Sequence, residues 1–224
     1  MQGTEISTLG EFGLIRHLTE KISIKNNTTL FGVGDDAAVL DYKGNKVLVT
    51  TDLLLEGVHF DLTYVPLRHL GYKAAIVNFS DIYAMNGQPK QLTVSLGISK
   101  RFCVEDLEDF YSGLQLACDI YGVDIVGGDT SVSMTGLTIS ITCIGEGVEG
   151  KIVYRSGAKE NDLICVSGDL GAAYMGLQLL EREKNIFKGE KDFQPDFSGK
   201  EYLLTSTVGH PKMFSRSFCR TVAL

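Results

Sequence analysis

Four short acidic clusters stand out in the 224-residue sequence, each beside glycine or hydroxyl residues and each at the edge of an apolar run. One such cluster is typical of a turn. Four of them, in a chain without a phosphate-cradling lysine loop, indicate a site where carboxylates hold metal ions and the metals hold a polyphosphate. The clusters are Gly32-Val33-Gly34-Asp35-Asp36-Ala37-Ala38, Thr50-Thr51-Asp52, Asn78-Phe79-Ser80-Asp81 and Gly127-Gly128-Asp129-Thr130.

The first cluster has two interpretations besides a metal site. It matches the loose GxGxxA pattern of dinucleotide-binding turns, and it also fits a tight turn that uses Gly and Asp for their backbone tolerance. The adjacent carboxylates of Asp35 and Asp36 would repel a pyrophosphate, at a cost on the order of 4 kcal/mol per like-charge contact at about 4 Å. A bound Mg²⁺ would make the interaction between carboxylates and phosphates favourable, because Mg²⁺ prefers hard oxygens and commonly bridges carboxylates to substrate phosphates.

Each remaining cluster also has a structural alternative. Thr50-Thr51-Asp52 ends an apolar strand, where its oxygens can face one ion or where Asp52 can cap a helix. Asp81 falls in an apolar helical stretch without a nearby Arg or Lys. Two interpretations are equally favoured: Asp81 binds a cation, or it lies on a solvent-exposed face of the helix. Gly127-Gly128-Asp129-Thr130 follows a short apolar strand. It fits close approach of the backbone to a ligand beside a metal-binding Asp, or a hairpin or bulge.

Hydrophobic periodicity predicts the elements that must position these clusters. Helices and strands mix without strict alternation, which favours an α+β layer architecture over a Rossmann sheet. A seam is predicted near Gly147-Gly150, followed by a helix and then by a polar stretch. The predicted helices are a first one from Leu9 to Ile22, then Arg68 to Met85, Val104 to Tyr121 and Ala172 to Glu183. The predicted strands are Ala37-Leu40, Lys46-Thr50, Leu92-Ile98, Asp124-Val126, Leu137-Gly145, Lys151-Gly157 and Asp162-Val166.

Composition narrows the function further. The formal net charge of -7 argues against general nucleic-acid binding, although a nucleotide can still bind through cations. No apolar run approaches the roughly 20 residues of a membrane helix, and the N-terminus has no secretory pattern, so a cytoplasmic protein without membrane contact is expected. The five cysteines are widely spaced, and Cys118, Cys143 and Cys165 are interpreted as small core residues rather than zinc ligands.

In their order and spacing the clusters resemble the thiamine-monophosphate kinase family. That family lies within the superfamily of ATP-dependent enzymes similar to aminoimidazole ribonucleotide synthetase. The resemblance runs from about Gly10 to Leu180, and the segment through His59-Phe60 disfavours a superfamily relative acting on a purine intermediate. Besides the four clusters, it is carried by Leu53-Leu54-Leu55-Glu56-Gly57-Val58-His59-Phe60, Ala84-Met85 and Arg155-Ser156-Gly157-Ala158-Lys159.

The resemblance implies a mixed-sheet N-terminal domain, a site of several Mg²⁺ ions between carboxylates and ATP, and a homodimer formed through that domain. The implied metal ligands are Asp36, Thr50, Thr51, Asp52, Asp81 and Asp129. The implied ATP-binding residues are Gly128, Asp129, Arg155 and, as a weaker carry-over that also fits half-buried packing, Tyr111. The implied residue for binding thiamine phosphate is His59, for which half-buried packing is the less favoured alternative.

The implied reaction transfers the γ-phosphoryl group of ATP to thiamine monophosphate, giving thiamine diphosphate and ADP by direct in-line transfer. The acceptor oxygen is already anionic, so no general base is assigned and catalysis is expected from positioning and charge neutralisation.

The resemblance also implies how the chain is divided. Residues 1–150 are expected to bind ATP and Mg²⁺ and to dimerise, and 151–204 to begin an incomplete second α/β domain. Residues 205–224 do not resemble the family, and their aperiodic, basic composition predicts an aberrant or disordered tail. The family's later Asp-Ile-Ser-Asp-Gly-Leu motif is absent from the sequence. The alternative function is therefore a non-catalytic truncated module that binds Mg-ATP and dimerises but lacks the acceptor site.

Overall fold

The structure, a computed structural model, describes Gly13, Arg16 and residues 25–32, 34–166, 170–187 and 197–208. Most of the predicted first helix lies outside these residues, although Gly13 and Arg16 are helical. Residues 209–224 of the predicted tail also lie outside them. Thr205–Val208 are helical, so the expectation that these four residues lack regular structure is wrong.

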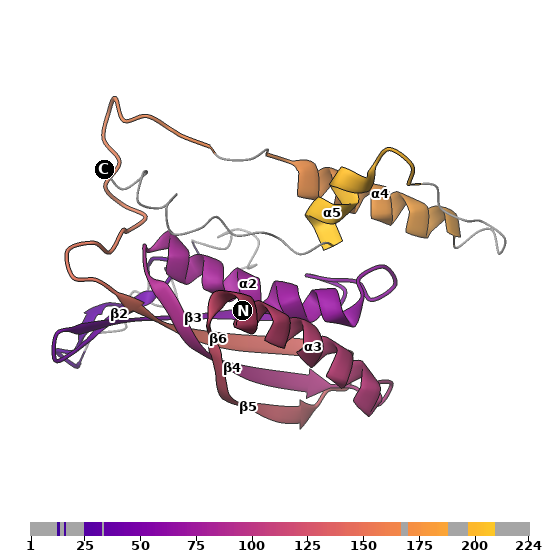
Figure 1. Cartoon of the computed structure of the whole chain (residues 1–224), viewed down its shortest axis with the longest axis horizontal. Helices are drawn as coiled ribbons and strands as arrows, with labels where there is room; N and C mark the ends of the chain where they lie inside the picture. Colours follow the sequence, from indigo (N-terminus) through magenta and orange to yellow (C-terminus); the bar gives the residue numbers. More distant parts are fainter. Residues whose placement is uncertain are drawn as a thin grey trace, which may run out of the picture.

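A six-stranded mixed sheet in the order β1-β2-β3-β6-β4-β5 forms the centre of the molecule (Figure 1). Neighbouring strands are antiparallel except β4 and β5, which are parallel. This architecture confirms the predicted α+β class with a mixed sheet. The strands are β1 (Thr29–Phe31), β2 (Ala38–Tyr42), β3 (Asn45–Leu55), β4 (Gln88–Ile98), β5 (Asp124–Val132) and β6 (Thr138–Gly147).

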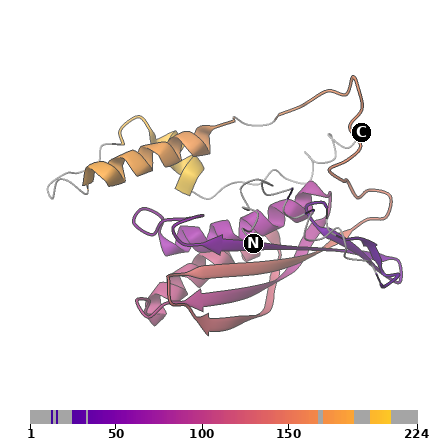
Figure 2. The same ribbon diagram turned by 180° about the vertical axis from the view of Figure 1, so that it is seen from behind.

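Two long helices, α2 (Leu67–Ala84) and α3 (Val104–Tyr121), pack side by side over the sheet (Figures 1 and 2). Two glycines permit this close approach. A Cβ on Gly113 would lie 1.7 Å from the Arg68 carbonyl oxygen, and one on Gly71 would lie 1.9 Å from that of Phe110. The predictions for these two helices were accurate because apolar periodicity marks them, and Gly122, with φ of 67°, forms the C-cap of α3.

The core fills the layer between α2 and the sheet. Phe79 and Ile82 of α2 are completely buried, as are Leu48 of β3 and Ile139 of β6. Burying side chains of this size stabilises the fold by about 1.5–3 kcal/mol each. The packing fixes the rotation of α2 over β3, and so decides which polar side chains of the helix reach that strand.

The strands extend further than predicted. The Thr50-Thr51-Asp52 cluster lies inside β3, because β6 pairs with β3 as far as Leu55. Gly127-Gly128-Asp129-Thr130 likewise lies inside β5, after an irregularity in its pairing with β4 near Leu92. The predictions that the first cluster ends a strand and that the second follows one are therefore wrong, and Asp52 is not a helix cap.

After β6, residues 148–166 form neither helix nor strand and are called the irregular segment. Further along the chain, α4 (Ala172–Phe187) and α5 (Glu201–Val208) lie side by side (Figure 1). The strands predicted over Lys151-Gly157 and Asp162-Val166 do not form. In the first segment the backbone N–H groups of Val153 and Arg155 bond to the Met85 carbonyl and the Asp35 carboxylate rather than to a strand.

Candidate functional site

Two acidic clusters that are distant in sequence meet where β3 passes under α2. Thr50 and Asp52, two residues apart, share the face of β3 that looks toward the helix. The Thr50 hydroxyl donates to Asp81 Oδ2 at 2.7 Å, and the Asp52 backbone N–H donates to Asn78 Oδ1 at 3.2 Å. Predicted metal ligands from β3 and α2 are therefore brought together.

Asn78 orients this meeting point from within the core. Its side chain is completely buried, and its Nδ2 donates to the Ala74 carbonyl at 3.0 Å, one turn earlier in α2. That bond leaves Oδ1 directed at the Asp52 amide. Asn78 belongs to one of the acidic clusters, and its structural role is to fix the spacing between β3 and α2 beside the carboxylates.

The loop before β2 adds further charged groups. Asp35 accepts hydrogen bonds from the backbone N–H groups of Asp36 and Arg155, both at 2.9 Å, and the Arg155 guanidinium forms an ion pair with Asp36. Arg155 also interacts electrostatically with Asp81. The expectation that Asp81 has no nearby Arg or Lys is therefore wrong. Arg155 is distant from Asp81 in the sequence, but the fold brings the two side chains close together.

The cluster places like charges in a partly dehydrated position. The net effect of the surroundings raises the pKa of Asp81 to about 6. Burial is the largest cause, and the nearby carboxylates of Asp52 and Asp36 also raise the pKa, while the Thr50 hydroxyl and Arg155 lower it. Burial also raises the pKa of Asp52, which His59 partly offsets. A bound cation would relieve this repulsion, which is the electrostatic condition that a metal site requires.

This raised pKa predicts how stability depends on pH without divalent ions. Asp81 binds a proton more readily in the folded chain than in the unfolded chain, so the free energy of unfolding should fall as pH rises from about 4 to about 6. Asp81→Asn should lose this part of the dependence. Urea unfolding of both proteins across that range measures it, and identical slopes for the two proteins would contradict the prediction.

Three predicted ligands lie elsewhere on the sheet. The Thr51 hydroxyl donates to the Ile141 carbonyl at 3.0 Å, and strand alternation puts its side chain on the face away from α2. Gly128 and Asp129 lie on β5, three strands and about 14 Å from β3 at the usual strand spacing. Packing also explains why residue 128 is a glycine, because a Cβ there would lie 1.8 Å from the Val94 carbonyl oxygen.

His59 lies in the turn that follows β3, close enough to Asp52 to interact with it electrostatically. Its Nδ1 accepts the Leu55 backbone N–H at 2.9 Å, and its carbonyl accepts a hydrogen bond from Lys73 Nζ at 3.3 Å. Burial lowers the pKa of Lys73. Lys73 is not among the predicted site residues, because nothing in the sequence pattern of α2 indicates that this lysine contacts the His59 turn.

Tyr111 lies on α3, away from the meeting point of β3 and α2. It is 37% exposed and packs edge-on against Phe110 with ring centroids 5.7 Å apart. This geometry is that of a half-buried packing residue with one accessible side, which was the structural alternative considered for it.

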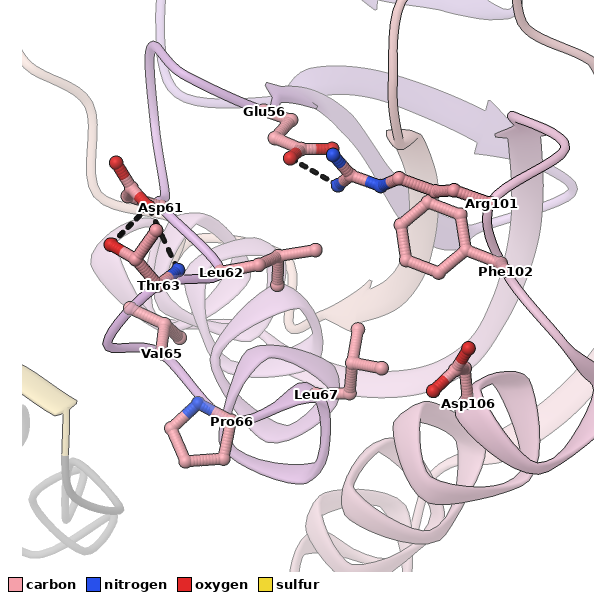
Figure 3. Close-up of a pocket in the computed structure, with 10 residues that line it drawn as sticks. All are labelled: Glu56, Asp61, Leu62, Thr63, Val65, Pro66, Leu67, Arg101, Phe102 and Asp106. Carbon is pink, nitrogen blue, oxygen red and sulfur yellow. Dashed lines mark hydrogen bonds and ion pairs between the residues drawn. The ribbon is translucent and has the colours of Figure 1, made fainter.

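A cavity of about 460 Å³ opens beside the His59 turn, between the start of α2 and the start of α3 (Figure 3). Glu56 forms one wall, where it pairs with Arg101 and accepts the Leu137 backbone N–H at 2.9 Å. Phe102 and Leu67 supply apolar surface, and Asp106 lies at the α3 side.

The residues present fit one mode of magnesium binding. Within the part of the chain that the structure describes, no group of three or more His, Cys, Asp or Glu side chains could hold a metal ion alone. Mg²⁺ usually keeps several waters and binds through one or two carboxylates plus substrate phosphates. Asp52 and Asp81 supply hard oxygens of that kind, with Asp36 near them.

Comparison with known proteins gives the class of fold and site. A family model described as AIR synthase related protein, N-terminal domain, matches residues 34–147, just over half of the chain. The chain therefore belongs to the AIR synthase related family. In the described residues, no helix is long and apolar enough to cross a membrane.

The curated relatives indicate a particular group within this family, and they confirm the resemblance seen in the motifs. Thiamine-monophosphate kinase of Bacillus subtilis (strain 168) is 38% identical over 178 residues, covering 79% of this chain and 54% of that protein. Thiamine-monophosphate kinase of Aquifex aeolicus (strain VF5) is 39% identical over 183 residues, covering 82% of this chain and 56% of that protein. The chain thus spans about half the length of these relatives.

A solved structure agrees with both findings. A protein described as AaThiL complexed with AMPPCP and TMP superposes with a TM-score of 0.81 at 33% identity. The superposition covers 100% of this chain and 65% of that chain. The fold of the described residues is therefore that of these kinases over the part of their length that the chain matches.

Proposed function

We propose that this chain catalyses ATP- and Mg²⁺-dependent phosphorylation of thiamine monophosphate to thiamine diphosphate. The observation that carries the proposal is the convergence of Asp36, Asp52 and Asp81 beside Arg155, with Asp81 partly dehydrated among like charges. The kinase relatives and the solved complex with AMPPCP and TMP support the same reaction. A cytoplasmic location is part of the proposal.

Each group of the site has a part in this reaction. Asp36, Asp52 and Asp81 would hold Mg²⁺, which when bound would neutralise charge on the phosphates. Arg155 would exchange its ion pair with Asp36 for the nucleotide phosphates, for which its planar fork of donors is suited. Asn78 holds the Asp52 backbone in place. The accepting phosphate oxygen is anionic, so the chain supplies orientation rather than a base.

His59 would contact the phosphate of the acceptor. It sits in a turn beside Asp52, so a phosphate there would lie near the nucleotide phosphates held by the carboxylates. Lys73 donates to the same turn and would stabilise its conformation. Direct in-line transfer requires the two phosphates to be held close together in this way.

A homodimer would give a role to Gly128 and Asp129, the predicted ATP ligands that lie away from the other carboxylates. The sheet face away from α2 leaves Leu53 52% exposed. The edge strand β5 exposes Val126 and Val132, and the turn after it exposes Met134. Apolar surface of this kind is typical of protein–protein contacts. The proposed dimer joins the sheets of two chains through their N-terminal domains, and Gly128 and Asp129 of β5 would lie at its surface.

A second candidate function rests on how much of the relatives the chain matches. The chain spans 54% and 56% of two curated kinases, and the segment after β6 exposes Leu163 and Ile164 almost completely. Residues 151–204 would then be the start of a second domain. The candidate is a non-catalytic module that binds Mg-ATP and dimerises without an acceptor site.

Phosphorus NMR of the full chain with ATP, Mg²⁺ and thiamine monophosphate separates these functions. The kinase predicts the resonances of thiamine diphosphate and ADP, and it predicts no product when thiamine monophosphate is omitted. Absence of product, with Mg-ATP binding retained in a calorimetric titration, would support the module instead. Absence of both product and binding would overturn both functions.

A further inference from the structure

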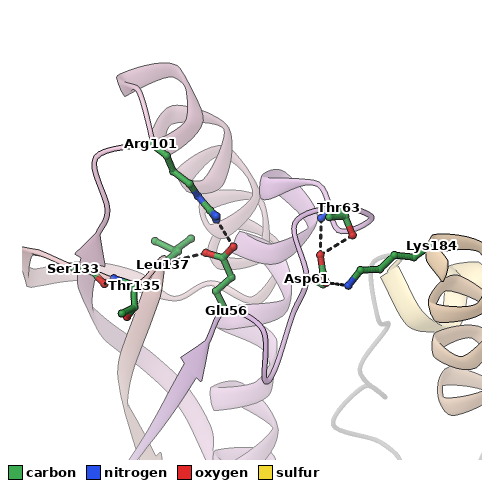
Figure 4. Close-up of polar contacts among 8 residues, drawn as sticks. All are labelled: Glu56, Asp61, Thr63, Arg101, Ser133, Thr135, Leu137 and Lys184. Carbon is green, nitrogen blue, oxygen red and sulfur yellow. Dashed lines mark hydrogen bonds and ion pairs between the residues drawn. The ribbon is translucent and has the colours of Figure 1, made fainter. Parts of the chain in front are cut away.

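Helix α4 contacts the N-terminal domain at two polar points. The Tyr64 hydroxyl donates to Glu181 Oε1 at 2.6 Å. Lys184 forms an ion pair with Asp61, which Figure 4 shows. The Lys184 ammonium also lies 5.8 Å from the centre of the Tyr64 ring. Glu181 and Lys184 are three residues apart in α4, so they share one face of the helix. These four residues are called the α4 clasp.

The N-terminal half of the clasp is a compact turn. One carboxylate oxygen of Asp61, Oδ1, accepts both the backbone N–H and the hydroxyl of Thr63, at 2.8 and 2.6 Å. The Asp61 backbone carbonyl accepts the N–H groups of Tyr64 and Val65. The second carboxylate oxygen, Oδ2, is the one that Lys184 contacts. Asp61 is therefore shared between its own turn and α4.

The ion pair is better shielded than a surface pair. The side chains of Asp61 and Lys184 are 22% and 23% exposed. Burial alone would raise the pKa of Asp61, but Lys184 and Thr63 together lower it to about 2. Both partners therefore stay ionised through the neutral range, and reduced exposure to water and salt keeps their attraction stronger than in exposed pairs.

The same segment is held at its other end by the sheet. Glu56 is fixed by Arg101 and by the Leu137 backbone N–H (Figure 4). A Cβ on Gly136 would lie only 2.8 Å from the Glu56 carboxylate, so this carboxylate packs closely on the β5–β6 connection. The His59 turn lies between these two anchors, with Phe60 buried beneath it. His59 is thus only two residues from Asp61 in a segment that is anchored on both sides.

We propose that the α4 clasp positions the His59 turn for the phosphorylated acceptor, so that Lys184 and Glu181 are positioning residues for acceptor binding. This proposal rests on the proposed kinase function. It assigns α4 a role in the acceptor half of the reaction, while the carboxylates under α2 serve the nucleotide half. Loss of the clasp should weaken acceptor binding and leave ATP binding unchanged.

The test compares Lys184→Met with Arg182→Met in the full chain, because Arg182 is an exposed cation two residues away on the same helix. Lys184→Met should raise the KM for thiamine monophosphate about fivefold and leave the KM for ATP within about twofold. Arg182→Met should change neither. Tyr64→Phe, which removes the second contact, should repeat the effect of Lys184→Met. Equal changes in both KM values would indicate a merely structural role and overturn the proposal.

Hydrogen exchange tests the clasp without relying on catalysis. The amides of Thr63, Tyr64 and Val65 bond to Asp61, so they should exchange about fivefold faster in Lys184→Met than in Arg182→Met. If no variant makes product but this difference appears, the clasp stands and the kinase function fails. Equal exchange rates in the two variants would overturn the clasp whatever the activity.

Discussion

Asp52→Asn is expected to reduce thiamine diphosphate formation at least about a thousandfold. Charge neutralisation by a bound metal contributes several kcal/mol to such reactions, and each 1.36 kcal/mol is about a factor of ten in rate. Asparagine keeps the shape of the side chain and the backbone bond to Asn78 Oδ1, so β3 and α2 should keep their spacing. The rate of product formation under saturating ATP and Mg²⁺ measures the effect.

The same variant should not lose stability, which separates loss of chemistry from loss of fold. Burial raises the pKa of Asp52, so the ionised carboxylate is less favourable in the folded chain than in water. Its neutral replacement should unfold at an equal or higher urea concentration without Mg²⁺. Asp119→Asn, an exposed position on α3, is the matched control and should keep full activity. Activity within tenfold of the parent chain would remove Asp52 from the metal site.

Gly113→Ala is expected to destabilise the fold by a net of about 2 kcal/mol, the largest structural effect that we predict. The added Cβ would lie 1.7 Å from the Arg68 carbonyl oxygen, and backbone atoms there have little freedom to move. Overpacking typically costs about 1–3 kcal/mol, and it must also exceed the gain of about 1 kcal/mol from replacing glycine in a helix. A total stability of about 5–15 kcal/mol makes such a loss readily measurable.

Urea unfolding of Gly113→Ala and of the control Ser112→Ala measures this effect. Ser112 is exposed on the same helix, and its replacement should change stability by no more than about 0.5 kcal/mol. If α2 and α3 could separate at low cost, Gly113→Ala would instead be more stable by about 1 kcal/mol. That outcome would show that the close approach of the helices does not hold α2, and with it Asp81, in place over β3.

The helices were predictable because their signals are local. Apolar spacing alone placed α3 at Val104–Tyr121, and α2 was found within one residue at each end. The strand ends were less accurate. The predicted strand Lys46-Thr50 stops before Thr51 and Asp52, which lie inside β3, where β6 pairs with it as far as Leu55. The reverse holds for Lys151-Gly157, which has strand-like composition but bonds to Met85 and Asp35 instead.

The features of the candidate site also fall into two groups, those that the local sequence predicts and those that depend on the fold. Residue types and spacing predict Asp36, Asp52 and Asp81 as metal ligands, because carboxylates beside glycines and hydroxyls are recognisable in a sequence. The contact between Thr50 and Asp81 depends on how α2 rotates over β3, which follows from packing rather than from local pattern. The return of Arg155 to Asp36, 119 residues earlier, depends on the path of the irregular segment after β6. Sequence periodicity contains no information on either.

The most direct test of the metal site is electron paramagnetic resonance of Mn²⁺, used in place of Mg²⁺, with a non-hydrolysable ATP analogue. The intact chain should remove free Mn²⁺ from solution in the presence of the analogue, and Asp52→Asn should bind the ion at least about tenfold more weakly. That result would place the metal and the nucleotide phosphates at the carboxylates under α2. Equal Mn²⁺ binding by the two proteins would contradict the proposed site.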